Sequence, residues 1–215
     1  MIKKYKTYRR IGMMLNQKMM KAYLDRDILF KAAGLLGIVS GNTLIFESED
    51  ETSVLMDFAL YECVSGNKSV TSTYHEKAGW ESKEEKDILA ALLSSYTSLF
   101  RITSINKSTL LLEDILNKKG DIPLIDIALS KTAVPGMLLF TRLIPFEDFN
   151  MTSGAGFVFP AGLEEYLLRR HKKLSKKVES GDESVKRFVA FYKLSKSSGL
   201  EVKYEKPAPR KESWR

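Results

Sequence analysis

The sequence predicts an α+β protein in which a small antiparallel β-sheet or barrel lies in the middle of the chain, flanked by N-terminal and C-terminal helices. Short β-compatible runs, several of which alternate apolar and polar residues, are confined to the middle of the 215 residues. Apolar residues spaced three and four positions apart, as on one face of a helix, occur on both sides. We therefore expect a mainly helical region at 1–95, a small β-rich region at 96–160, C-terminal helices packing on it at 161–205, and a disordered tail at 206–215.

Two helices are predicted at the N-terminus. Apolar residues recur at helical spacing along 3–23, which indicates one buried face. A second helix is expected at 28–36, because Asp25 or Asp27 can cap its start and Gly37 stands where a glycine often ends a helix. The apolar residues that define the first helix are Tyr8, Ile11, Leu15, Met19 and Ala22.

The rest of the N-terminal region is predicted to contain two more helices. A turn leads into a short strand at 43–47, and acidic residues then precede a third helix at about 53–63. The polar stretch 65–73 is expected to be a loop. The apolar spacing of 83–95 again predicts a helix.

The middle of the chain changes to strand-like patterns. Four β-compatible runs, 98–103, 109–112, 124–129 and 136–144, are separated by turn-forming residues, and such closely spaced strands usually make a small antiparallel sheet or barrel. The glycine-rich segment 151–160 is expected to be a loop and an edge strand. The residues predicted to be buried here are Leu99, Ile102, Leu110, Leu112, Ile125, Ile127, Leu138 and Phe140.

The last third of the chain returns to helical spacing. Apolar residues share one face over 163–178 and again over 185–192, with a break at Gly181 and Asp182 between them. A further strand is possible at 200–204. Two helices are therefore expected after the sheet.

Charge is distributed in three blocks. Lys and Arg exceed Asp and Glu by nine to two in 1–31 and by fifteen to eight in 161–215, whereas acids exceed bases by seventeen to ten in 32–160. The composition excludes a wholly disordered chain, and no apolar run approaches the ~20 residues that cross a bilayer, so no membrane span is expected. The single cysteine, Cys63, fits a small buried residue in a reducing compartment, and the cytoplasm is the expected location.

The sequence nominates no catalytic residue, no metal site and no cofactor. Cysteine and histidine are too few and too widely spaced for a metal site, and no nucleophile elbow or phosphate-binding loop is present. Adjacent carboxylates such as Glu113 and Asp114 would point to opposite faces of a strand. An enzyme is accordingly the least favoured class of protein.

The strongest physical feature is a basic face on the helix at 163–178. Arg169, Lys172, Lys173 and Lys176 fall within about a third of the helical circumference, opposite the apolar residues. This face could follow the phosphates of a nucleic acid. It could equally neutralise the acidic middle of the same chain, and both alternatives remain open at this stage.

A second candidate surface lies on the first helix, which is rich in methionine. Met13, Met14, Met19 and Met20 stand beside Arg9, Arg10, Lys18 and Lys21. Methionine side chains adapt readily to a core or to a partner. These residues therefore predict either core packing or a docking site for another protein or a membrane surface.

Three sequence phrases resemble a family of uncharacterised prokaryotic proteins: LMDFALYE at 55–62, LFTRLIPF at 139–146 and MTSGAGFVF at 151–159. The resemblance extends over about residues 30 to 160, and it implies no activity, cofactor or catalytic residue. From charge alone, we expect a non-enzymatic binding module of the cytoplasm that contacts nucleic acid through the basic C-terminal helix. The alternative is a protein-interaction or structural subunit with no nucleic-acid role.

Overall fold

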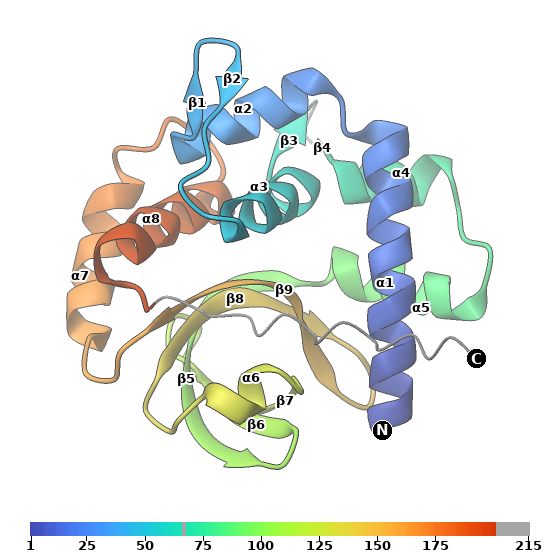
Figure 1. The fold of residues 1–215 in the computed structure, drawn as a ribbon. Coiled ribbons are helices and arrows are strands. Elements are labelled where there is room, and N and C mark those ends of the chain that lie inside the picture. The colour runs from blue at the N-terminus through green and yellow to red at the C-terminus, as the bar shows by residue number, and fades with distance from the viewer. Residues whose placement is uncertain (66–67, 201–215) are drawn as a thin grey trace, which may run out of the picture.

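A computed structural model describes residues 1–65 and 68–200 of the chain. Within these residues a closed five-stranded barrel is covered by helices from both ends of the chain (Figure 1). The predicted α+β class is therefore confirmed. Over the same residues, no helix has both the length and the apolar content that a membrane crossing would need.

The N-terminal helices begin and end close to where the sequence predicts. Asp25 caps the second helix by accepting a hydrogen bond from the Ile28 amide at 2.8 Å, and Gly37 ends it in the left-handed conformation with φ 80°. The helices of this region are α1 (Ile2–Tyr23), α2 (Arg26–Leu36), α3 (Asp50–Tyr61), α4 (Val70–Lys77) and α5 (Lys83–Leu93).

Two short hairpins interrupt these helices. Strands β1 (Val39–Ser40) and β2 (Thr43–Leu44) pair between α2 and α3, while β3 (Val64–Ser65) and β4 (Lys68–Ser69) pair between α3 and α4. The expectation of a loop through residue 73 was wrong in its second half. The Ser69 hydroxyl accepts a hydrogen bond from the Ser72 amide and so starts α4 within the polar stretch.

The barrel has the strand order β5-β6-β7-β9-β8, and β8 closes it by pairing with β5. All pairs are antiparallel except β7 and β9, whose parallel contact joins Leu124 to Asn150. The sheet is therefore mixed rather than purely antiparallel, because the final hairpin inserts β9 beside β7. The barrel elements are β5 (Tyr96–Asn106), β6 (Thr109–Asp114), β7 (Lys119–Ile125), α6 (Leu129–Thr132), β8 (Leu138–Pro145) and β9 (Asn150–Phe159).

The chain forms a three-stranded meander (β5, β6 and β7), then the helix α6, then a hairpin (β8 and β9) that closes the barrel. This connectivity matches that of the OB-fold, a five-stranded Greek-key barrel. In this chain the helix between the third and fourth strands, α6, is a single turn. Larger helices from both ends of the chain cover one side of the barrel instead (Figure 1).

The glycine-rich segment at 151–160 is not a loop or an edge strand. It forms most of β9, which pairs with β8 along its length and contacts β7 on its other side. The glycines allow this close packing: a Cβ atom built on Gly156 would lie 3.1 Å from the carbonyl oxygen of Phe140 in β8.

The core has three parts. One fills the barrel with residues such as Phe100 and Leu112, and a second lies between the outer side of β8 and β9 and helices α2, α3 and α8. In the second part the ring of Phe140 stacks on that of Phe191 with centroids 4.3 Å apart. The third joins α1, α4 and α5 to the barrel through residues such as Ile144. Of the eight residues predicted to be buried, only Ile127, beyond the end of β7, is half-exposed.

The chain after the barrel forms a helical hairpin of α7 (Glu164–Ser175) and α8 (Glu183–Ser198), as expected. Asp182 caps α8 by accepting a hydrogen bond from the Ser184 amide at 2.7 Å. Leu200 forms an isolated bridge with Val158 of β9, while the rest of the possible strand at 200–204 and the tail expected at 206–215 lie outside the described residues. Helices α7 and α1 lie on opposite sides of the molecule (Figure 1).

Candidate functional site

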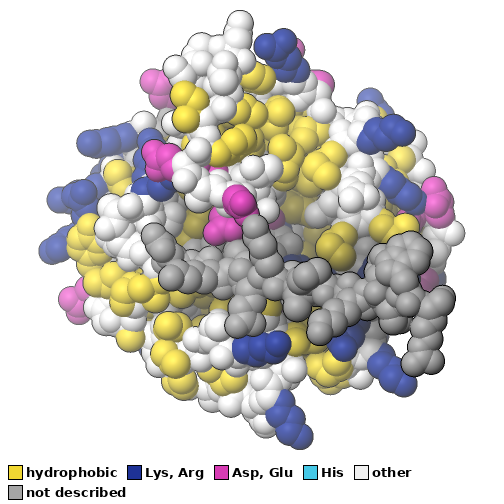
Figure 2. Space-filling model, viewed as in Figure 1, with side chains coloured by type: hydrophobic (Ala, Val, Ile, Leu, Met, Phe, Trp, Pro, Cys, Tyr) yellow, Lys and Arg dark blue, Asp and Glu magenta, His cyan; other side chains and the backbone are white. Residues whose placement is uncertain are grey.

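The outward surface of α7 and of the turn that follows it carries a group of exposed cations. We call this group the α7 cationic face. Lys and Arg side chains gather along the left edge of the space-filling view, over α7 (Figure 2). The exposed residues of the face are Arg169, Arg170, Lys172, Lys173, Lys176 and Lys177.

The apolar side of α7 fixes this orientation. Leu167 is fully buried, and Leu163 and Leu174 pack against the same core. The ring of His171 stacks on Phe191 of α8 with centroids 5.2 Å apart, and burial lowers the pKa of this histidine. Because these side chains hold one narrow side of α7 against the protein, the remaining circumference faces solvent.

No ion pair joins any residue of the α7 cationic face to another residue in 1–65 or 68–200. Cations elsewhere do pair with acids: Arg101 contacts both Glu113 and Glu164, the latter at the start of α7. Neutralisation of the face by the acidic middle is therefore not seen within the described part of the chain. Lys172 and Lys173 in the last turn also oppose the negative end of the helix dipole, which favours them there without any ligand.

Two members of the face were missed by reasoning from the sequence. Arg170 and Lys177 lie outside the arc that holds the four predicted cations, and on a helical wheel they are close to the apolar side. Their exposure depends on how narrow the packed side of α7 is. That width is set by tertiary packing, chiefly against α8, and not by the sequence of α7 itself.

The four methionines of α1 are not together on one surface. Met13 and Met14 are 56% and 49% exposed, whereas Met19 is fully buried and Met20 packs against the same cluster. Met19 thus contributes to the core, and no partner could reach it in this conformation. Only Met13 and Met14 remain as an exposed pair.

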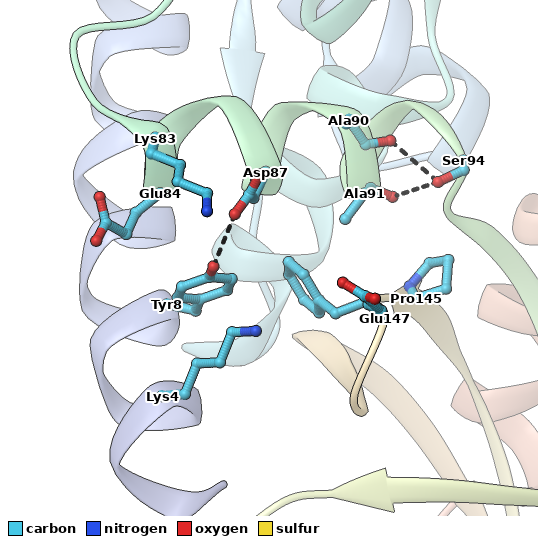
Figure 3. A pocket seen from close by; sticks show the side chains of 11 residues that line it. Lys4, Tyr8, Lys83, Glu84, Asp87, Ala90, Ala91, Ser94, Pro145 and Glu147 are labelled. Carbon is cyan, nitrogen blue, oxygen red and sulfur yellow. Dashed lines mark hydrogen bonds between the residues drawn. The ribbon is translucent and has the colours of Figure 1, made fainter.

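A pocket of about 520 Å³ lies between α1, α5 and the loop that joins β8 to β9 (Figure 3). Tyr8 donates a hydrogen bond to Asp87 at 3.0 Å, and burial together with that carboxylate raises the pKa of Tyr8. The tyrosine is therefore protonated at neutral pH and can serve neither as a base nor as a nucleophile. Lys4 pairs with Asp148, and the pocket is also lined by the charged side chains of Lys83, Glu84 and Glu147.

A cluster of buried charges surrounds Arg142 of β8. Arg142 is 4% exposed, and its Nη2 atom lies 2.5 Å from Glu62 while its Nε atom lies 3.6 Å from Asp57. The guanidinium also stacks 4.8 Å from the centre of the Tyr61 ring. Because the cluster is sealed from solvent and joins α3 to the barrel, its role is structural.

Within the described residues there is no group of three or more His, Cys, Asp and Glu side chains that could hold a metal ion. Burial raises the pKa of the Cys63 thiol to about 11, so this cysteine is protonated at neutral pH. The α7 cationic face is consequently the best-defined candidate site, and binding is the chemistry that it can perform.

Comparison with known proteins identifies the family. A model of a family described as being of unknown function, DUF7986, matches residues 1–205. The chain belongs to this family. No curated protein and no solved structure gives a significant match.

The DUF7986 match confirms the resemblance to an uncharacterised family and extends it beyond residues 30 to 160. It spans both groups of helices as well as the barrel, so the α7 cationic face lies inside the family region. DUF7986 carries no assigned activity.

Proposed function

We propose that this protein is a non-enzymatic binding module that holds nucleic acid through the α7 cationic face. The observation that carries the proposal is a set of six exposed cations, none of them ion-paired within the described residues. Lys and Arg side chains that neutralise phosphates release condensed counterions, which is the main source of sequence-independent affinity. Cys63 as a protonated, unbridged thiol agrees with a reducing compartment, and we propose the cytoplasm.

The dimensions of the face suit several consecutive phosphates. Within α7, residues 169–175 extend over about 9 Å at the helical rise of 1.5 Å per residue, and Lys176 and Lys177 follow in the turn. Duplex DNA carries one charge per ~1.7 Å of its axis. Tyr166, the aromatic residue of α7, is half-buried in the core beside α8. Without an exposed aromatic ring on the face, base stacking is not expected, and binding should depend on the nucleic-acid backbone.

The barrel itself is a less suitable contact surface. OB-folds bind oligonucleotides and oligosaccharides on the face of their second and third strands, which here are β6 and β7. On the outer side of β6 and β7 lie two carboxylates, Glu113, which pairs with Arg101 of β5, and the exposed Asp121. The exposed Lys119 is the only cation in either strand. The α7 cationic face is the better electrostatic match for phosphate.

Titration of labelled DNA and RNA oligonucleotides, followed by fluorescence anisotropy at several salt concentrations, tests the proposal. The unmodified protein should bind at ~50 mM salt with an affinity that falls steeply as salt rises. Changing Lys172, Lys173 and Lys176 together to Gln should weaken binding to all sequences alike and lower the salt slope by up to ~3.

The matched control changes Lys3, Lys6 and Lys21 of α1 to Gln, which removes the same charge from the opposite side of the molecule. This variant should retain most of the affinity and the full salt slope. Absence of binding by the unmodified protein at ~50 mM salt would reject the proposal. Salt-insensitive self-association or capture of a protein would then favour the interaction-subunit alternative.

A further inference from the structure

Helix α1 carries a second exposed surface with a different chemistry from that of α7. None of the 22 residues of α1 is acidic. Residues 161–215, whose net charge equals that of residues 1–31, contain eight acids. The inner side of α1 is occupied by buried residues such as Tyr5 and Leu15. Its outer side, which we call the α1 stripe, consists of Lys3, Lys6, Arg10, Met13, Met14 and Lys21.

The α1 stripe is one continuous line along the helix. At 100° per residue, its six side chains fall within about a quarter to a third of the circumference. From residue 3 to residue 21 the stripe extends over about 27 Å. Figure 1 shows α1 as a straight helix along one side of the molecule, next to α4 and α5.

Apolar side chains lie among the cations of the stripe. Met13 and Met14 are 56% and 49% exposed, and at the start of the helix Met1 and Ile2 are 72% and 38% exposed. The Nη1 atom of Arg10 lies 3.7 Å from the Met14 sulfur, so a charged and an apolar group are side by side at the surface. Among the described residues, none of the exposed large apolar side chains lies in 164–177. Helix α7 therefore does not combine exposed cations with exposed apolar side chains as α1 does.

The cations of the stripe are available to a partner. Within the described residues, no ion pair involves Lys3, Lys6 or Lys21, whereas Lys4 and Lys18, on other sides of the same helix, pair with acids of the barrel loop and of the α5 region. Arg9, also off the stripe, donates to the Thr152 carbonyl at 2.6 Å and so anchors the helix to β9. The stripe is thus held rigidly and faces outward.

We infer that the α1 stripe docks on an anionic phospholipid surface. Its cations complement lipid headgroup phosphates and carboxylates, and its methionines enter the boundary between headgroups and acyl chains. A purely ionic partner would offer the methionines no apolar contact. A nucleic acid offers no apolar layer for Met13 and Met14. The inference does not rest on the function proposed for α7, because the two surfaces share no residue.

Co-sedimentation of the full chain with vesicles tests the inference. The unmodified protein should bind vesicles of phosphatidylcholine mixed with phosphatidylserine and should not bind vesicles of phosphatidylcholine alone. Changing Lys3, Lys6 and Lys21 to Gln should weaken binding about 100-fold, at about fivefold per cation. Changing Met13 and Met14 to Gln should weaken it about tenfold while leaving all charges in place.

The control is the Lys172, Lys173 and Lys176 to Gln variant, which removes as much charge and should bind vesicles as the unmodified protein does. Circular dichroism and thermal unfolding check that each variant is folded. A Met14→Cys variant labelled with an environment-sensitive dye should show a blue shift on anionic vesicles, which reports contact at the stripe itself.

Three outcomes would overturn the inference. The folded protein could fail to bind anionic vesicles, or the methionine variant could bind them as tightly as the unmodified protein, which would indicate general charge attraction. Alternatively, the α1 changes could abolish self-association in place of vesicle binding, in which case a second copy of the chain occupies the stripe. Loss of nucleic-acid binding in the α7 variant alone leaves the inference intact, so the two proposals fail separately.

Discussion

At the scale of single residues, the buried arginine of β8 shows how a charge can organise the interior. Arg142 sits between Asp57 and Glu62, and Glu62 also accepts hydrogen bonds from Thr97 and Ser184. Burial raises the pKa of Asp57, and the charge of Arg142 opposes that rise. The Glu62 side chain, directly after α3, thus joins α8 through Ser184 and two strands of the barrel through Thr97 and Arg142.

Replacing Arg142 by Ala should lower the free energy of unfolding by about 3–5 kcal/mol, because two buried carboxylates lose their cation. Urea denaturation measures the loss. As a control, Lys68→Ala removes a cation from an exposed pair with Glu76 and should cost under ~1 kcal/mol. Equal losses in the two variants would contradict the structural role given to Arg142.

The aromatic contact of β8 with α8 permits a second test at this scale. Phe140 is 1% exposed and stacks on Phe191, so Phe140→Ala should destabilise the protein by ~3–5 kcal/mol, as measured by urea denaturation. Val134→Ala, at a side chain that is 51% exposed, should change stability by under ~0.5 kcal/mol. A loss below ~1 kcal/mol for Phe140→Ala would mean that this face of β8 is not packed as described.

At the scale of helices and strands, sequence features that depend on near neighbours in the chain predicted the structure correctly. Helix α2 begins after Asp25 and ends at Gly37, and the sequence predicted both ends. Such caps are predictable because they depend only on neighbours within four residues. The segment 151–160 was predicted as a loop and an edge strand, and its place inside the barrel was missed, because the role of its glycines depends on tertiary contacts with β8 and with Arg9. Helical spacing placed four cations on the solvent side of α7 and Met19 on the apolar face of α1, as the structure shows. Grouping Met19 and Met20 with the exposed Met13 and Met14 as one candidate surface was wrong.

Two glycines in different elements should respond to alanine in opposite directions. Gly154 in β9 has φ 104°, a conformation that L residues rarely adopt, so Gly154→Ala should destabilise the protein by ~1–3 kcal/mol. Gly12 lies inside α1 with nothing within 4 Å of an added Cβ, so Gly12→Ala should stabilise it by ~0.5–1 kcal/mol. Thermal unfolding measures both, and a stabilising Gly154→Ala would refute the strained conformation.

At the scale of the whole molecule, carboxylates on separate elements tie the chain together. Glu51 at the start of α3 accepts a hydrogen bond from Tyr192 and pairs with Lys196 of α8, while Glu85 of α5 pairs with Lys18 of α1. Burial would raise the pKa of both glutamates, but these partners outweigh it and lower each pKa below the ordinary value. Their contribution to stability is therefore present at neutral pH and is lost as pH falls.

We expect the unfolding temperature to drop as the pH falls below the ordinary glutamate pKa of about 4.5 and Glu51 and Glu85 become protonated. Changing both residues to Gln should lower stability at neutral pH and flatten this part of the pH profile. Thermal unfolding followed by circular dichroism across that range measures the effect. An acid profile as steep in the double variant as in the unmodified protein would assign the transition to other groups.

The attachment of α1 to the β8–β9 hairpin also bears on how the chain is made. Lys4 pairs with Asp148 and Arg9 bonds to Thr152, contacts that span 144 and 143 residues of sequence. During synthesis the start of the first helix, where Tyr5 and Tyr8 pack on Phe149, must therefore wait uncovered until the β8–β9 hairpin has left the ribosome. The rest of its apolar side can pack earlier on α4 and α5. Nascent chains that stop before residue 150 should be the forms most dependent on chaperones and most exposed to proteases.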